Sequence, residues 1–161
     1  MTARAVFQRG FTMIEVLLVM VILGVLITIA VPSFTNYISS QKVKTASFDL
    51  YAAMLFARSE AIKRRVNVTV AATGGDWKNG WTVVATGVPD PLRTQDALTG
   101  VNISNTTTSV VYRLDGRLTS GAALGMLIQP QAADASIKNR CIRVDLTGLP
   151  KSTNTTTTTC P

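Results

Sequence analysis

A single carboxylate stands at the start of a long apolar segment, and its surroundings demand an explanation. Glu15 is followed by an almost unbroken apolar run from Val16 to Val31. Gly10 and the aromatic Phe11 come just before it, after a leader that carries basic residues. An ionised carboxylate close to lipid is strongly unfavourable unless a partner compensates its charge, so an acid at this position indicates a function. We therefore expect Glu15 to have a partner.

The apolar segment is long enough to cross a membrane. Residues 11–31 number 21, and as a helix they would extend roughly 31 Å, about the thickness of a hydrocarbon core. Arg4 and Arg9 precede the segment and no acid does, so the positive-inside bias predicts a cytoplasmic leader. A secretory signal has a shorter apolar core and a small-residue cleavage site after it, to which Ala30-Val31-Pro32 is only a weak match.

Residues 10–23 resemble the start of a type IV prepilin. The resemblance rests on Gly10-Phe11-Thr12-Met13-Ile14-Glu15 followed by the apolar residues 16–23. It implies that a membrane-bound prepilin peptidase cuts between Gly10 and Phe11 and methylates the new amino terminus at Phe11. Glu15 then becomes the fifth residue of the mature protein. The alternative is a membrane anchor that is not cleaved.

The same resemblance implies a role for Glu15 in assembly. A free α-amine has a pKa of about 8, so the mature terminus at Phe11 is cationic near neutral pH. Because opposite charges attract strongly at low dielectric, the Glu15 carboxylate of an incoming subunit is expected to meet the amine of a subunit already in the filament. The alternative is a carboxylate that reaches the lipid headgroups, close to the mature end of the chain.

Beyond Pro32, which we expect to kink or interrupt the helix, a second helical pattern follows. Its apolar residues recur at intervals of three or four, at Val43, Ala46, Leu50, Met54, Ala57 and Ala61. A second apolar face consists of Phe48, Tyr51, Leu55 and Ile62. We expect one face to pack on a sheet and the other on neighbouring subunits. At the end, Glu60 and Arg64 are spaced for an ion pair, and the basic triplet 63–65 complements the helix dipole, with a nucleic-acid contact as the alternative.

After Arg65 the apolar period changes to alternation, which is typical of strands. The expected strands are residues 66–70, 80–84, 101–104, 109–114, 126–129 and 140–146. Asn79-Gly80 and Asp115-Gly116 are turn signals between them, and Trp77 and Trp81 are expected to pack rather than to stack on bases. The prediction is an α+β fold, type IV pilin-like, with a long amino-terminal helix packed on a carboxy-terminal antiparallel β domain.

This pattern divides the chain into four parts. Residues 1–10 are a cleaved leader, residues 11–35 the transmembrane and assembly half of the helix, residues 36–65 its amphipathic second half, and residues 66–161 an extracytoplasmic β-rich head. The only two cysteines are Cys141 and Cys160, which predicts a disulfide in an oxidising compartment, with two free thiols as the alternative. The threonine run at 155–159 would then be a flexible part of a carboxy-terminal disulfide loop.

Later landmarks resemble the FimT/FimU/GspH branch of pilin-like proteins. They are residues 57–64, 80–81, 114–117, 140–144 and 147–148. The resemblance implies a minor type IV pilin that helps initiate pilus assembly at or near the filament tip, with the major pilin and other minor pilins as partners. The alternatives are a GspH-like minor pseudopilin of type II secretion and a FimT-like pilin that binds DNA for natural transformation.

DNA-binding members of that branch carry a carboxy-terminal motif of glycine, arginine, any residue and arginine. At the corresponding place this chain has Gly148-Leu149-Pro150-Lys151; the first arginine is missing, and lysine lacks the planar fork of the second. The candidate phosphate contacts are Lys138, Arg140, Arg143 and Lys151. Residues 138–161 carry +3, and such binding would weaken steeply with salt. The alternative is a set of solvated cations, with Arg143 on the outward face of a strand.

Composition argues against an enzyme. Histidine is absent, which removes the commonest general base and metal ligand. Gly74-Gly75 lacks the lysine and the spacing of a phosphate loop, so we expect no catalytic residue, cofactor or metal. The net charge of +7 falls to +5 when Arg4 and Arg9 leave with the leader. The expected location is the bacterial inner membrane, as a single-pass protein with a periplasmic head, and then a pilus or pseudopilus.

Overall fold

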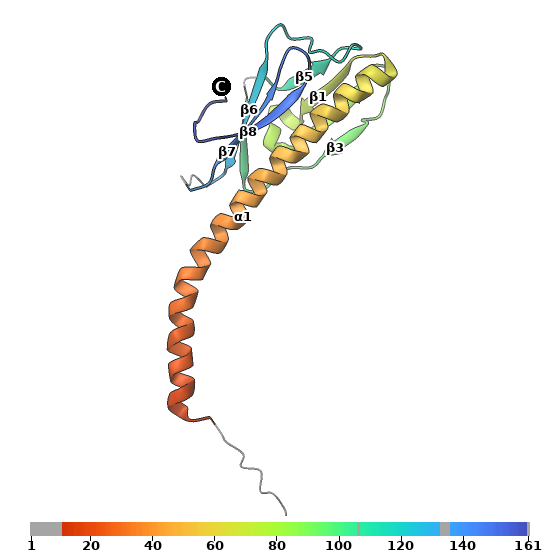
Figure 1. Ribbon diagram of the computed structural model, residues 1–161. Coiled ribbons are helices and arrows are strands. Elements are labelled where there is room, and N and C mark those ends of the chain that lie inside the picture. The colour runs from red at the N-terminus through yellow and green to blue at the C-terminus, as the bar shows by residue number, and fades with distance from the viewer. Residues whose placement is uncertain (1–10, 106, 133–135, 161) are drawn as a thin grey trace, which may run out of the picture. The chain divides into compact units, whose positions relative to one another are not determined.

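The computed structural model describes residues 11–105, 107–132 and 136–160 (Figure 1). The chain divides into two compact units, Met1–Thr35 and Asn36–Pro161. The helix α1 (Met13–Arg64) begins in the first unit and ends in the second. α1 continues through Pro32, so an interruption of the helix there, one of the two expected outcomes, is wrong. A proline removes a single N–H donor, and α1 has 52 residues over which to hold its conformation.

In the second unit, one face of α1 is buried and the opposite face is not. The six residues of the predicted apolar stripe are all buried: Val43, Ala46, Leu50, Met54, Ala57 and Ala61. By contrast, Phe48 is 68% exposed and Ile62 46% exposed. The 3.6-residue period therefore identified the face that packs on the chain's own β-structure.

The β-structure forms two four-stranded antiparallel sheets. The first has the order β3 (Arg93–Gln95), β2 (Trp81–Ala85), β1 (Val68–Ala72) and β5 (Ser109–Tyr112). The second has the order β4 (Val101–Ser104), β6 (Leu124–Pro130), β7 (Asn139–Val144) and β8 (Pro150–Thr155). β4 and β5 are consecutive in the chain but lie in different sheets, and Figure 1 shows the last turns of α1 beside strands of both.

Alternating side chains of both sheets join α1 in one hydrophobic core. Val70 of β1, Val83 of β2, Met126 and Ile128 of β6, and Ile142 of β7 are each exposed by 0%. Strand residues two apart point to the same face, so one face of each sheet supplies this core. The predicted fold class, a long helix packed on an antiparallel β domain, is confirmed.

The connection between β1 and β2 differs from the predicted Asn79-Gly80 turn. It contains two 3₁₀ turns, η1 (Thr73–Gly75) and η2 (Trp77–Asn79). Trp77 is buried, its Nε1 donates a 2.8 Å hydrogen bond to the carbonyl of Thr107, and its ring lies 6.4 Å from that of Trp81. Burying an aromatic ring within the loop requires a longer connection than a two-residue turn. The expected packing role of both tryptophans is confirmed.

Two strands were absent from the predicted set. β3 has only three residues, which is too short for a periodic pattern. β8 is polar, and its residues from Lys151 to Asn154 are exposed. It forms because β7 offers it a complete antiparallel register from Asn139–Thr155 to Val144–Pro150. Pairing along a neighbouring strand, rather than burial of its own side chains, makes this segment a strand.

Candidate functional sites

The amino-terminal segment presents Phe11 and Glu15 without cover from the rest of the chain. Phe11 is 82% exposed, and every residue from 11 to 31 is exposed. Thr12 precedes the helix and caps it: the backbone N–H of Glu15 donates to the Thr12 carbonyl at 3.1 Å and to its Oγ1 at 3.4 Å. The acid in the first turn also complements the positive end of the helix dipole. Gly10, the expected cleavage residue, lies outside the described residues.

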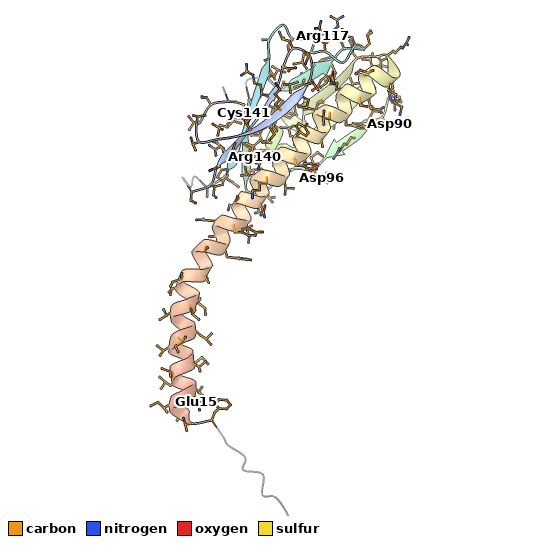
Figure 2. The ribbon with its side chains drawn as sticks, viewed as in Figure 1. Glu15, Asp90, Asp96, Arg117, Arg140 and Cys141 are labelled. Carbon is orange, nitrogen blue, oxygen red and sulfur yellow. A yellow bond between two sulfur atoms is a disulfide. The ribbon has the colours of Figure 1, made fainter. Side chains whose placement is uncertain are left out.

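The exposed segment has the length and composition of a membrane span. Within α1 an 18-residue window has a mean hydropathy of 3.0, and none of it is buried in the protein. A helix so apolar needs contacts that the described chain does not provide, because exposed apolar surface is unfavourable in water. Figure 2 shows Glu15 at the start of this segment, where its side chain would meet whatever covers the helix.

A disulfide bond joins Cys141 to Cys160, with 5.4 Å between their Cα atoms. Cys141 lies on β7 directly opposite Leu127 of β6, and both are buried although neither belongs to the core beneath α1. Cys160 lies over Gly125, where an added Cβ would come within 3.0 Å of the Cys160 Cβ. The disulfide thus holds the carboxy-terminal loop on the outer face of the second sheet.

Part of the threonine run has a defined conformation within that loop. Thr155 ends β8. The backbone N–H of Thr157 donates to Thr155 Oγ1 at 3.1 Å, and Asn139 Nδ2 donates to the Thr157 carbonyl at 3.2 Å. These bonds and the disulfide give the low-complexity run more order than its composition predicts.

Three of the landmark motifs meet at one junction. Arg58 Nε of α1 donates a 3.1 Å hydrogen bond to the carbonyl of Gly116, in the turn after β5. Gly148, in the turn between β7 and β8, has φ +79°, and a Cβ there would lie 2.0 Å from the Gly116 oxygen. Only glycine fits such an approach and such a φ. The motifs were recognised separately in the sequence, and the structure shows that they form one packing unit.

Asp145 and Tyr112 border this junction. The Asp145 carboxylate accepts hydrogen bonds from the Thr147 hydroxyl, the Thr147 N–H at 3.0 Å and the Leu149 N–H at 3.1 Å. These hydrogen bonds hold the pKa of Asp145 below its ordinary value, and the bond from the Thr147 hydroxyl contributes most. Burial raises the pKa of the Tyr112 phenol, and within the described part of the chain its hydroxyl has no hydrogen-bond partner. Asp145 thus stabilises the turn between β7 and β8, and Tyr112 packs beside Gly148 in the same turn.

The structure divides the four candidate phosphate contacts. Arg143 of β7 lies directly opposite Lys151 of β8, and both are exposed. Arg140 is three residues from Arg143 and therefore lies on the other face of the strand. There it lines a groove with Lys44, Ser47, Phe48, Tyr51 and Ser152. Lys138 is exposed before β7 begins. Arg143 and Lys151 therefore share one surface, and Arg140 lies on a different one.

The basic end of α1 has the predicted ion pair. Glu60 lies 2.5 Å from Arg64 Nε and 3.7 Å from Lys63 Nζ. The hydrogen bond from Arg64 is the main reason why the pKa of Glu60 lies below its ordinary value. Arg65 follows the helix with φ +55°, in the left-handed region that favours glycine. Lys63 and Arg64 are thus neutralised in part by Glu60, while Arg65 ends the helix.

No group of three or more Cys, Asp or Glu side chains that could hold a metal ion occurs within residues 11–105, 107–132 and 136–160. The side chains that converge in the described structure do so in packing junctions and on exposed surfaces.

Comparison with known proteins identifies the two regions separately. Residues 46–148 match the family described as Type II transport protein GspH, and residues 7–31 match the prokaryotic N-terminal methylation motif. Among curated relatives, the type IV major α-pilin of Moraxella bovis is 42% identical over 45 residues, and the type IV major fimbrial protein FimA of Dichelobacter nodosus is 47% identical over 36 residues. The first match covers 28% of this chain and 28% of the α-pilin. The second covers 22% of this chain and 23% of FimA. The chain therefore spans about a quarter of the length of either relative.

Solved structures share the fold. The minor pilin FimU of Pseudomonas aeruginosa is similar with a TM-score of 0.60 and 20% identity, over 75% of this chain and 93% of FimU. The minor pseudopilin EpsH of Vibrio cholerae is similar with a TM-score of 0.56 and 12% identity, over 70% of this chain and 97% of EpsH. The GspH match covers most of the chain, and the methylation motif lies where the prepilin-like residues were recognised. The chain therefore belongs to the GspH family, carries the prokaryotic N-terminal methylation motif and has a type IV pilin-like fold.

Proposed function

We propose that this protein is a minor type IV pilin that helps initiate pilus assembly and is incorporated at or near the filament tip. The observation that carries the proposal is the exposed apolar half of α1 with Glu15 in its first turn, joined to a head of the GspH family. A subunit of this kind can remain in the membrane before assembly and bury the same apolar surface against other subunits afterwards.

The proposal includes the processing of the amino terminus. Prepilin peptidase cuts between Gly10 and Phe11 and methylates Phe11, and the Glu15 carboxylate then pairs with the terminal amine of a neighbouring subunit. The methylation-motif match over residues 7–31 supports this processing. In the proposed topology the leader, residues 1–10, is cytoplasmic, residues 11–35 lie in the inner membrane, and residues 36–65 and 66–161 form a periplasmic helix and head with the disulfide.

The test is a count of surface pili in an in-frame deletion strain whose pilus retraction is also disabled. We expect few or no pili, with wild-type numbers restored by the wild-type gene. Because retraction is disabled, a low count reports failed initiation rather than faster disassembly. Normal pilus numbers together with a loss of type II secretion would contradict the proposal and assign the chain to the pseudopilus.

DNA binding is a second candidate function, and the pairing of Arg143 with Lys151 across β7 and β8 favours it. Two exposed cations on one surface can contact the phosphates of a nucleic-acid backbone. Detergent-solubilised mature protein should then shift duplex DNA at 50 mM salt and lose that shift at 200 mM. The variant Arg143→Ala/Lys151→Ala should bind more weakly and with a smaller dependence on salt. No shift at low salt would end this hypothesis.

A further inference from the structure

A second surface of the head combines exposed apolar side chains with arginines. Leu55, Arg58 and Ile62 recur at intervals of three or four along one face of α1, and Arg65 directly follows the helix. The turn after β5 adds Arg113, Leu114 and Arg117, all exposed. We call these seven residues the arginine patch. Figure 2 labels Arg117 close to the end of α1.

The contacts between α1 and the turn show that the patch is one surface. Arg58 Nε donates to the Gly116 carbonyl at 3.1 Å, and a Cβ at Gly116 would lie 2.6 Å from Ile62 Cδ1. The turn itself is closed by 2.8 Å backbone hydrogen bonds between Arg113 and Gly116 and between Arg113 and Arg117. The turn is therefore held against the helix.

The apolar members of the patch remain exposed although the core lies close by. Leu55 is 36% exposed, Ile62 46% and Leu114 54%. A cluster of exposed apolar side chains surrounded by arginines is typical of protein–protein interfaces, where apolar groups form the centre and charged groups the rim.

The charges of the patch are only partly compensated. Arg113 lies 3.6 Å from Asp115, and the adjacent Lys63 and Arg64 share Glu60. In the described residues the side chains of Arg65 and Arg117 make no ion pair or hydrogen bond. Arg65 also occupies a backbone conformation, φ +55°, that glycine or asparagine adopts with less strain.

We propose that the arginine patch binds an acidic surface of a different pilin-like subunit. The proposal rests on the function proposed above and names the surface and the chemistry of the partner. Guanidinium groups bind carboxylates through paired hydrogen bonds, and complementary charge selects the partner. A second copy of this chain would present the same excess of cations, so contact between two such patches would be repulsive.

The experiment uses the full chain in its own host. Arg65→Glu/Arg117→Glu reverses two charges in the patch, and Lys78→Glu/Arg93→Glu makes the same charge change outside it. We expect the patch variant to lower the amount of this protein in sheared filaments at least tenfold. The control should retain at least half of it. Membrane abundance and the urea midpoint of the purified protein, equal in both variants, would show that the fold is intact.

Crosslinking identifies the partner directly. A photoreactive phenylalanine at Leu114 should form an adduct with another pilin-like subunit at a peptide of net negative charge. The adduct should disappear with Arg65→Glu/Arg117→Glu and return when acidic residues of that peptide are changed to lysine. An adduct with a second copy of this chain, with nucleic acid or with a peptide that is not acidic would overturn the inference.

The two proposals fail in different ways. If the deletion abolishes pili but the patch variant is incorporated like the control, the inference on the patch is wrong and the assembly function stands. If the deletion leaves pilus numbers and type II secretion unchanged, the assembly function itself is wrong.

Discussion

The two halves of α1 differ in both apolar pattern and burial. In the first half Leu17 is 64% exposed and Leu23 46% exposed, whereas in the second half Leu50, Met54 and Ala57 are exposed by 0%. The second half obtains its apolar contacts from two sheets of the same chain. The first half has none within the described residues, which agrees with the proposal that lipid and other subunits supply them.

A single helix can suit two different environments because the pattern of apolar residues differs between its two halves. The first half is apolar on every side from Val16 to Val31, which suits a membrane or the interior of a filament. The second half has a buried apolar stripe and a second, more exposed apolar face with polar residues between them, which suits one sheet-facing side and one exposed side. Two predictions test this division and two more test the stability of the head, from the largest expected effect to the smallest.

Replacing the one acid of the first half should abolish assembly without affecting the head. Glu15→Ala removes the carboxylate proposed to meet a neighbouring amine, so incorporation into filaments should fall below detection while cleavage and membrane abundance stay unchanged. Immunoblots of precursor, mature and sheared-filament fractions measure all three. Ile14→Ala, at the neighbouring position, serves as the control and should be incorporated. Normal incorporation of Glu15→Ala would remove Glu15 from the proposed mechanism.

Truncating one leucine in each half should separate stability from assembly. Leu50→Ala leaves a cavity in the core and should lower the free energy of unfolding of the head by about 2–5 kcal/mol. Leu17→Ala should leave that free energy unchanged, because Leu17 is 64% exposed. Urea unfolding of the protein in detergent, followed by the fluorescence of buried Trp77 and Trp81, measures the difference. Equal effects of the two changes would contradict the division.

Removing the disulfide should destabilise the head by a similar or smaller amount. Cys141→Ser/Cys160→Ser opens a loop whose ends are 19 residues apart, and the chain-entropy model gives a loss of roughly 3 kcal/mol. The same urea titration measures it. Reductant should lower the midpoint of the wild-type protein to that of the variant and should not change the variant further. If full reduction leaves the urea midpoint of the wild-type protein unchanged, packing on the outer face of the second sheet, and not the disulfide bond, holds the loop.

Asp145→Asn should have the smallest effect, and the effect should depend on pH. The folded pKa of Asp145 is depressed, so its stabilisation is present above the ordinary carboxyl pKa and is lost as the pH falls through the folded value. We expect a loss of about 0.5–1 kcal/mol at pH 7 that shrinks below about pH 4. Unfolding at both pH values, with exposed Asp90→Asn as the control, measures it. A difference that grows in acid would reverse the assigned sign.

Most of the helix and the amino-terminal methylation motif could be predicted from the sequence, because both depend on local pattern. Glycine, aromatic residue, acid and apolar run are contiguous in residues 10–31, and the buried stripe from Val43 to Ala61 follows a 3.6-residue period. β8 could not be predicted from an apolar pattern, because its residues from Lys151 to Asn154 are polar and exposed. The burial of Trp77 within a loop likewise left no periodic signal.

What the sequence by itself determined is the set of local segments: an apolar helix with one acid, an amphipathic continuation, alternating strands and two cysteines. Only the tertiary structure decided which segments meet. It placed Gly148 against Gly116 and Arg58, brought Arg143 opposite Lys151 and put Arg140 on the other face. The physical reason is strand register: a shift of one residue exchanges the two faces of a strand, and register is set by packing across the whole head rather than by neighbouring residues.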